Sequence, residues 1–304
     1  MDWLSQVSVQ QHLFPLVIFF FALAIGIELT VGHFKVLLAR PHIPVLGTLV
    51  HTIAFPLVVG VILSVVLFFG LNVEDYILLG IVLLASCPSG GFSNLLVLLA
   101  RADIALSVLL TAVSSLISFV TVPFFFWLFA QFLPQLSGEV ALPVGQTLLS
   151  LLFMVVIPVG AGMAWRAKFP EYVVPRIRKI QNLGQISLYV VLLIMLIQDW
   201  DNLIGGVGPV MPWALGLCFV SLATGFILSR FVGLGPADCA TVAIESSIRN
   251  LAVAFLIATT VLDRVDIALL PSVYFIAVLI VGLGFARFWR VRMAPRYAAR
   301  STSE

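Results

Sequence analysis

Long apolar runs separated by short polar connections dominate the chain from about residue 12 to residue 289. A helix needs about 20 predominantly apolar residues to cross a bilayer, and most of these runs reach that length. The pattern predicts nine membrane-spanning helices, at roughly residues 12–31, 43–69, 75–100, 103–133, 144–165, 181–199, 209–231, 236–262 and 268–289. We therefore expect an all-α polytopic membrane protein, with one transmembrane domain over residues 1–304.

The composition supports this class and excludes others. Hydrophobic residues make up 62% of the chain and charged residues 10%, far from the balance of a soluble domain. The three cysteines are widely spaced in apolar segments, which is neither a disulfide framework nor a metal-binding spacing. No nucleotide-binding loop or Ser/His/Asp arrangement occurs, so we expect no enzyme.

The basic residues predict the orientation. With nine spans, the loops on one side hold 14 of the 16 lysines and arginines, the other side holds Arg264, and Arg249 lies within a span. Cytoplasmic loops carry the excess of basic residues. We expect the N-terminus outside, the Arg-rich tail at residues 290–304 in the cytoplasm, and location in the cell inner (plasma) membrane. The partner of that tail is then the lipid headgroup layer, not a nucleic acid.

Two apolar runs are interrupted by polar residues, at positions 86–94 and 245–250. Hydrocarbon offers no hydrogen bonds, so broken backbone at that depth must line a cavity enclosed by protein. These are the third and eighth spans, five apart, so equivalent helices would cross in opposite directions. The pattern predicts an inverted repeat, about 12–133 and about 144–289, whose discontinuous helices cross near the midplane.

The first interruption offers oxygen ligands for a cation. Pro88 lacks a backbone donor and two glycines follow it, so carbonyl groups are freed. Ser93 and Asn94 add side-chain oxygens. In the next span Ser107 and Thr111 are four apart and share one helix face, although such hydroxyls also commonly bond their own helix carbonyls.

Glu245 is the carboxylate of the second interruption. A lone ionised carboxylate at this depth is costly unless it is paired or coordinates an ion. Arg249, four residues on, is its obvious partner, and a structural ion pair that holds the helix break is one interpretation. The other is that Glu245 anchors a cation while Arg249 balances charge or faces an anionic ligand.

At these residues the chain resembles the bile acid:sodium symporter family, over nearly its whole length. The glycine-containing segment 24–29 resembles the end of an early family helix, and segment 101–108 resembles the one after the first break. Residues 87–94 resemble the family's Cys-Pro-Gly-Gly-x-x-Ser-Asn stretch, with Ser89 in place of the first glycine. Residues 245–250 resemble its Glu-x-x-x-Gln-Asn.

The resemblance implies ten helices in bacterial members, so that this chain would begin at the second. It also implies a core and a panel, with substrate bound between them behind the crossing of the broken helices. By this analogy the first, fifth and sixth predicted helices form the panel. The family's first sodium site carries over onto five positions of this chain: Ser93, Asn94, Ser107, Thr111 and Glu245.

The second sodium site of the family does not carry over. It uses two glutamines, and His51 and Arg249 stand at those positions here. A guanidinium has donors but no acceptor, so it cannot ligate sodium, but it can place a fixed positive charge where the ion would sit. We predict that Arg249 replaces the second ion. His51 is either a hydrogen-bonded core histidine or a group that couples transport to protons.

The leading hypothesis is sodium-coupled symport of an organic anion, bile-acid-like or a small carboxylate, with Asn250 and the broken backbone lining the substrate cavity. The alternatives are a sodium-independent or proton-linked carrier or exporter, for which Cys87 is the residue to mutate, and a receptor or scaffold that no longer transports. Oligomeric state and transport direction stay open at this point.

Overall fold

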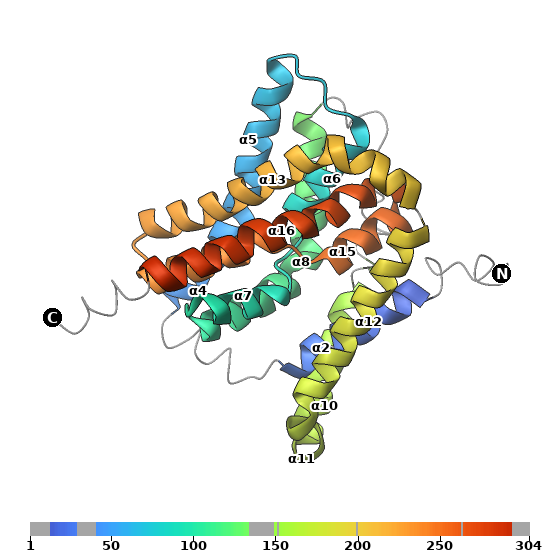
Figure 1. Ribbon diagram of the computed structural model, residues 1–304. Helices are drawn as coiled ribbons and strands as arrows, with labels where there is room; N and C mark the ends of the chain where they lie inside the picture. Colours follow the sequence, from blue (N-terminus) through green and yellow to red (C-terminus); the bar gives the residue numbers. More distant parts are fainter. Residues whose placement is uncertain are drawn as a thin grey trace.

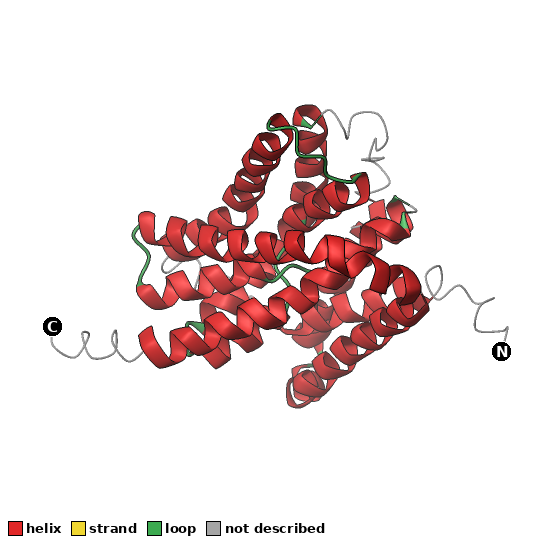
Figure 2. Cartoon of the chain, turned by 45° about the horizontal axis from the view of Figure 1, so that its top comes forward, coloured by secondary structure: helices red, strands yellow, loops and turns green. Residues whose placement is uncertain are grey.

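The computed structural model of the protein describes residues 13–28, 41–133, 149–150, 152–198, 200–262 and 264–293, and in them every regular element is helical (Figures 1 and 2). The longer helices are α2 (Phe14–Glu28), α4 (His42–Leu49), α5 (Phe55–Phe68), α6 (Asp75–Ser86), α7 (Phe92–Ala100), α8 (Ile104–Phe132), α10 (Ile157–Lys168), α12 (Ile177–Gln198), α13 (Trp200–Phe231), α14 (Pro236–Ser247), α15 (Leu251–Leu256) and α16 (Leu269–Phe288). Short helices complete the chain: η2 (Val50–Ala54), η4 (Leu152–Val156), α11 (Pro170–Val173), η5 (Val174–Arg176), η6 (Ile257–Val261), η7 (Val265–Ala268) and η8 (Trp289–Met293).

Within these ranges three continuous helices are long and apolar enough to cross a membrane: His42–Phe68, Gly205–Phe231 and Val265–Met293. Two bent pairs raise the number to five, one turning by 64° within α8 and one by 104° between α10 and the segment Pro170–Gly184. Pro123 lies inside α8 and cannot donate to the carbonyl one turn back, a usual cause of such a bend. The fold is that of a polytopic membrane protein; nine spans and an inverted repeat stay predictions.

The third and eighth predicted spans are each divided into two short helices. α6 and α7 are separated by extended backbone that begins at Cys87 (φ −67°, ψ 148°), and α14 and α15 by extended backbone that begins at Ile248 (φ −107°, ψ 107°). The two breaks cross as an antiparallel bridge between Ser89 and Arg249. Gly90 N donates to Ile248 O (3.0 Å) and residue 250 N donates to the carbonyl of residue 88 (2.9 Å). Each break thus satisfies backbone groups of the other where lipid could not.

Three helices form a group beside the rest of the described chain. α10 and α12 pack on α2, seen at the lower right of Figure 1. At the α2–α10 crossing the backbones touch: a Cβ added at Gly162 would lie 2.3 Å from Leu23 O, and one at Gly26 would lie 2.0 Å from Val159 O. Glycine is the residue that allows helices to approach this closely. These three helices are the ones that the resemblance assigned to the panel.

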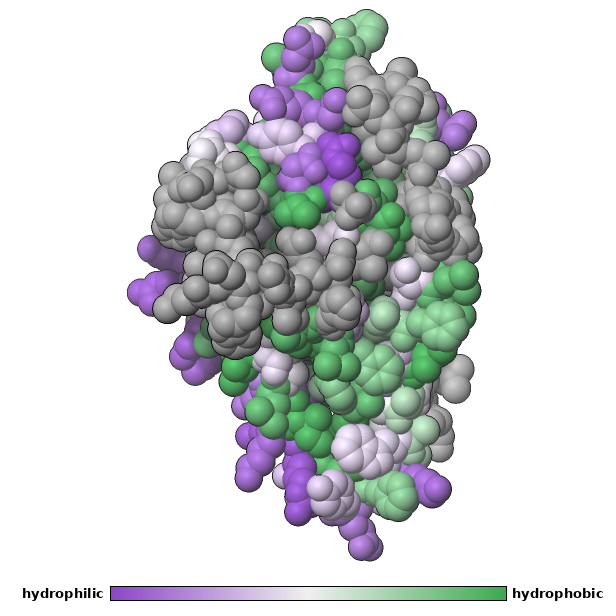
Figure 3. All heavy atoms as spheres, turned by 90° about the vertical axis from the view of Figure 1, so that its right-hand side faces the viewer, coloured by the Kyte–Doolittle hydropathy of each residue, from purple (hydrophilic) through white to green (hydrophobic). Residues whose placement is uncertain are grey.

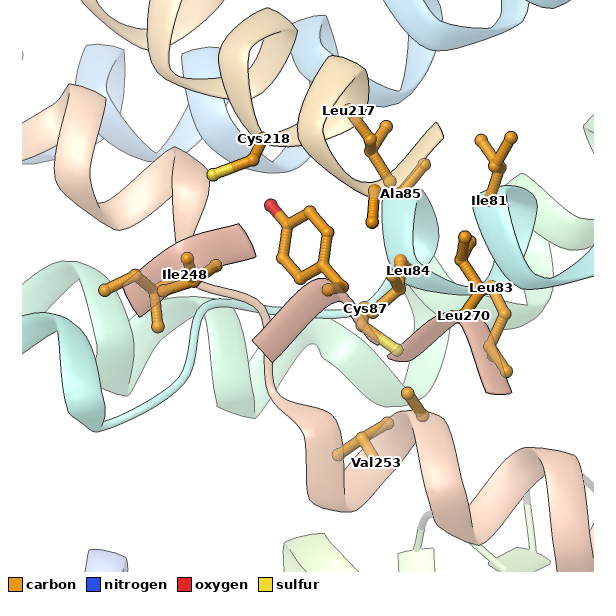
Figure 4. Close-up of a cluster of buried hydrophobic side chains, with 14 of the residues drawn as sticks. Ile81, Leu83, Leu84, Ala85, Cys87, Leu217, Cys218, Ile248, Val253 and Leu270 are labelled. Atoms are coloured by element: carbon orange, nitrogen blue, oxygen red, sulfur yellow. The ribbon is translucent and has the colours of Figure 1, made fainter. Parts of the chain in front are cut away.

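The remaining helices surround a core centred on α6. All ten residues from Ile77 to Ser86 are buried, as expected of a helix that is apolar on every side. Figure 4 shows α6 side chains such as Leu84 beside Leu217 of α13 and Leu270 of α16. Outside this core many large apolar side chains are exposed, and Figure 3 shows hydrophobic residues gathered at the centre and lower right of one face. A bilayer is the surrounding that such a surface suits.

Candidate functional site

Glu245 lies in the last turn of α14 and is completely buried. Its carboxylate accepts hydrogen bonds from three hydroxyl groups. Ser89 Oγ, in the first break, donates to Oε2 at 2.5 Å, and Thr111 Oγ1 of α8 donates to the same oxygen at 3.0 Å. Ser107 Oγ, one turn earlier on α8, donates to Oε1. A carboxylate in this position is desolvated by the protein and satisfied by hydroxyls from two other elements.

The remaining two predicted ligands lie in the same network. Ser93 Oγ is 3.3 Å from Thr111 Oγ1, and Asn94 Oδ1 is 2.7 Å from Ser107 Oγ. Because a hydroxyl has one proton, Ser107 can donate to either Asn94 or Glu245 but not to both at once. The structure therefore gathers carboxylate, amide and hydroxyl oxygens from α7, α8, α14 and the first break, which are the ligands that a hard cation takes.

Hydrogen bonds one helical turn away from these oxygens align α8 with α14. Asp103 caps α8 by accepting from Leu106 N (2.9 Å), and Asp103 N donates to Thr241 Oγ1 (2.9 Å) on α14. Asp103 and Ser107 are one turn apart on α8, as are Thr241 and Glu245 on α14. The cap therefore brings the serine hydroxyl opposite the carboxylate.

Arg249 is buried, but no ion pair joins it to Glu245 among the described residues. Of the two interpretations of these residues, the structural ion pair is the one that the structure does not show, and the reason is the helix break. α14 ends at Ser247 and Ile248 is extended, so Arg249 no longer lies on the helix face that carries Glu245.

The Arg249 side chain instead lies against the helix that runs from α4 into α5. Nη1 donates to His51 O (3.2 Å) and to Cys87 O (3.1 Å), and the guanidinium carbon lies 4.0 Å from the centre of the Phe55 ring. Two carbonyl acceptors and a cation–π contact thus hold the group in one orientation.

A π-helical turn explains why the carbonyl of His51 is free to accept from Arg249. In η2, Phe55 N donates to Val50 O, five residues back. The next residue in that pattern is Pro56, which has no N–H to give to His51 O. The His51 ring is buried, with Nδ1 2.8 Å from Gly47 O. The histidine therefore contacts the arginine through its backbone.

Asn250 is placed at the start of α15. Its Oδ1 accepts from Val253 N (3.2 Å), which makes it the N-cap of that helix. This side chain does not line the polar cavity described next. Its visible role is to begin the helix after the second break.

A polar cavity of about 200 Å³ lies between the α2–α10–α12 group and the start of α7. Its lining residues are Phe21, Ala24, Ile25, Gly91, Asn94, Leu95, Gln181 and Asn182. Asn94 belongs to both the cavity and the oxygen network around Glu245. An occupant of the cavity would therefore be one residue away from a bound cation.

Three residues of this site were not predicted as such. Ser89 was noticed only as a departure from the family motif, yet its hydroxyl reaches the buried carboxylate. A hydroxyl in place of a glycine beside a predicted cation site was the available signal. Gln181 and Asn182 are polar residues at the beginning of a predicted span, which was the only sign of the cavity.

Comparisons with known proteins identify the family of the chain. The profile of the Sodium Bile acid symporter family matches residues 15–205. The chain is 24% identical over 279 residues to the uncharacterized sodium-dependent transporter YocS of Bacillus subtilis, covering 91% of this chain and 83% of that one. It is 26% identical to the probable chloroplastic sodium/metabolite cotransporter BASS2 of rice (94% and 66%) and 29% identical to the human ileal sodium/bile acid cotransporter (78% and 65%). The chain thus spans just under two thirds of the length of the rice and human relatives.

These relatives are transporters and not enzymes, as the absence of a catalytic motif predicted. The profile match extends over more than half of the chain and includes the first break and α8. This chain belongs to the Sodium Bile acid symporter family.

Proposed function

We propose that this protein is a secondary transporter that carries an organic anion together with sodium by alternating access. The observation that carries the proposal is the convergence of oxygen atoms on Glu245, a buried carboxylate at the crossing of two broken helices. Broken helices that meet within a membrane domain are where secondary transporters bind their coupling ion.

Sodium, as transported ion, would be bound by Ser93, Asn94, Ser107, Thr111 and Glu245, to which we add Ser89. Binding would reorient hydroxyl protons that now point at the carboxylate. The ion would neutralise the charge of Glu245, which the protein otherwise compensates with neutral hydroxyl donors alone. Because the ligands come from both broken helices and α8, binding would favour the conformation in which all of them meet.

The second sodium of the family would be replaced by Arg249. Its Nη1 occupies the carbonyls of His51 and Cys87, which are the kind of backbone oxygens that would otherwise ligate an ion. A tethered cation stays with the protein through the transport cycle. We therefore expect one transported sodium per cycle.

The proposed substrate site is the polar cavity beside Asn94. Gln181 and Asn182 offer amide donors, and Gly91, Asn94 and Leu95 place the N-terminal end of α7, the positive end of its dipole, at the cavity. Phe21, Ile25 and Leu95 form an apolar wall. The cavity suits a carboxylate with an apolar body, either a small acid or the end of a larger one, which fits the bile acid and metabolite cotransporters among the relatives.

The topology that we propose keeps nine helices in one transmembrane domain built as an inverted repeat. The α2–α10–α12 group would be the panel and the other helices the core. The N-terminus would face outward and the tail inward at the plasma membrane; residues 294–304 of that tail lie outside the described residues.

The first step of the test is to find a ligand. The melting temperature of the purified protein is measured in sodium or potassium with a panel of carboxylates and steroid acids. A compound that binds the native state raises the melting temperature. Uptake of the best ligand into proteoliposomes is then measured with and without a sodium gradient. We expect sodium-dependent uptake with a Hill slope near one. A slope clearly above one that Arg249→Gln leaves unchanged would reject the replacement of the second ion.

Two other outcomes would favour the alternative functions. Uptake that does not depend on sodium would identify a sodium-independent carrier. Cys87 would then be the first residue to mutate, and the buried His51 the residue to test for coupling to protons. A ligand that binds but is never transported would identify a receptor.

A further inference from the structure

The guanidinium of Arg249 has one edge that the described residues leave without a hydrogen-bond partner. Nη1 is engaged by two carbonyls and the planar group lies over the Phe55 ring. Nε and Nη2 are buried and have no partner in the described chain. These two nitrogens form the side edge of the guanidinium, where two N–H bonds run parallel. That edge is the fork with which arginine binds an anion in a bidentate manner.

Charge points to the same conclusion. Arg249 is 3% exposed and has no carboxylate within ion-pair distance in the described residues. The nearby carboxylate, Glu245, is satisfied by hydroxyls and would be neutralised by sodium. With sodium bound, one positive charge would stay uncompensated in the protein interior, where an unpaired charge is strongly unfavourable.

Two hydroxyls of the segment that Arg249 contacts also lack partners. Thr48 in α4 and Thr52 in η2 lie on either side of His51 in the chain, and the His51 carbonyl accepts from Arg249. Both hydroxyl oxygens are buried without a hydrogen-bond partner among the described residues. Buried polar groups of native proteins nearly always have a partner, so these hydroxyls agree with a bound ion or water in this part of the interior.

We propose that the Nε–Nη2 edge of Arg249 binds one small monovalent anion, chloride or a small carboxylate, at a place separate from the substrate cavity beside Asn94. Thr48 and Thr52 would donate to the same anion. The edge is shut off from solvent, so the group that reaches it must be small. Where sodium is bound at Glu245, the pair of one cation and one anion leaves the interior with the same charge as before. Only that pairing rests on the proposed function; the anion site itself does not.

The test is thermal unfolding of the purified full chain at constant sodium and ionic strength, in gluconate, chloride or acetate. Gluconate is the bulky reference anion, chloride is the inorganic probe and acetate is the carboxylate probe. We expect chloride, acetate or both to raise the melting temperature, by roughly 2 °C for each tenfold increase above the dissociation constant. A response to chloride would assign an inorganic anion, and a response to acetate alone would assign a small carboxylate.

Three variants make the test specific. Arg249→Gln removes the charge and should abolish the anion response. Arg249→Lys keeps the charge but loses the fork, so it should weaken the response by at least tenfold in anion concentration, and it serves if the glutamine variant does not fold. Arg101→Gln, which removes an exposed arginine of the same domain, should leave the response unchanged.

Equal melting temperatures in the three sodium salts would overturn the proposal, as would an anion response that survives in both Arg249 variants. Repeating the series with potassium salts separates the two proposals. An anion response in potassium, without any added effect of sodium, would reject sodium symport and leave the anion site standing.

Discussion

Replacing Glu245 by glutamine tests the central element of the site with little change of shape. The side chain is completely buried and its two oxygens accept from hydroxyls of three residues. Glutamine keeps one acceptor oxygen, and the hydroxyls of Ser89 and Thr111 can rotate to accept from its amide group. The variant also removes a desolvated charge, so without sodium we expect it to be at least as stable as the wild type.

The expected loss of sodium affinity follows from the burial of the carboxylate. Two unit charges 4 Å apart attract by about 4 kcal/mol at an effective dielectric constant of about 20. Losing that attraction weakens binding by about a factor of 10³, since each 1.4 kcal/mol is about tenfold. The neutral oxygens of Asn94, Ser107 and Thr111 would remain but would not replace it.

The assay is the melting temperature of purified protein during a sodium titration, with potassium holding the ionic strength constant. We expect the wild type to be stabilised by sodium and Glu245→Gln to show no sodium-specific rise. Glu171→Gln is the matched control, because Glu171 is exposed on α11 and far along the chain from the site. Sodium affinity within about tenfold of the wild type in Glu245→Gln would refute the assignment of the coupling ion to this carboxylate.

Three further substitutions test the surroundings of the site. Ser89→Ala removes a hydrogen bond to the buried carboxylate and should lower the free energy of unfolding without sodium by about 1.5–3 kcal/mol, and an unchanged sodium titration would show that the serine is not a ligand. Gly162→Ala forces α2 and α10 apart and should cost about 1–3 kcal/mol, visible as a lower melting temperature, whereas Gly160→Ala on the same helix meets open space and should be neutral or stabilising. Tyr274→Phe removes the 2.7 Å hydrogen bond to the last carbonyl of α14 and should lower the free energy of unfolding by about 1–3 kcal/mol; an unchanged melting temperature would show that this carbonyl finds another donor.

The sequence predicted which residues lie together better than it predicted how they are connected. Each of the five proposed sodium ligands was chosen for its residue type at a break or on a helix face, and in the structure all five belong to one hydrogen-bond network. The interpretation of Glu245 and Arg249 as an ion pair depended on a continuous helix. A spacing of four means a shared face only while the helix lasts, and α14 ends between the two residues.

The two glycines of the first break also show a difference that the sequence does not contain. From the sequence, Gly90 and Gly91 appear equivalent as residues that loosen a helix. In the structure a Cβ at Gly90 would lie 2.9 Å from Arg249 O, while one at Gly91 would meet nothing within 4 Å. The difference comes from the second break, which crosses at the first glycine only. No local pattern contains that crossing, because its two halves lie about 160 residues apart.

Hydrophobic composition and the two polar interruptions were sufficient to establish an all-helical membrane protein with broken helices. These properties depend on how each segment interacts with lipid, which is local in the chain. The partners of Arg249, the hydroxyl of Ser89 on the carboxylate and the cavity beside Asn94 depend instead on segments that meet only after folding. Packing brings those groups together, so their roles became visible only once the helices were placed against one another.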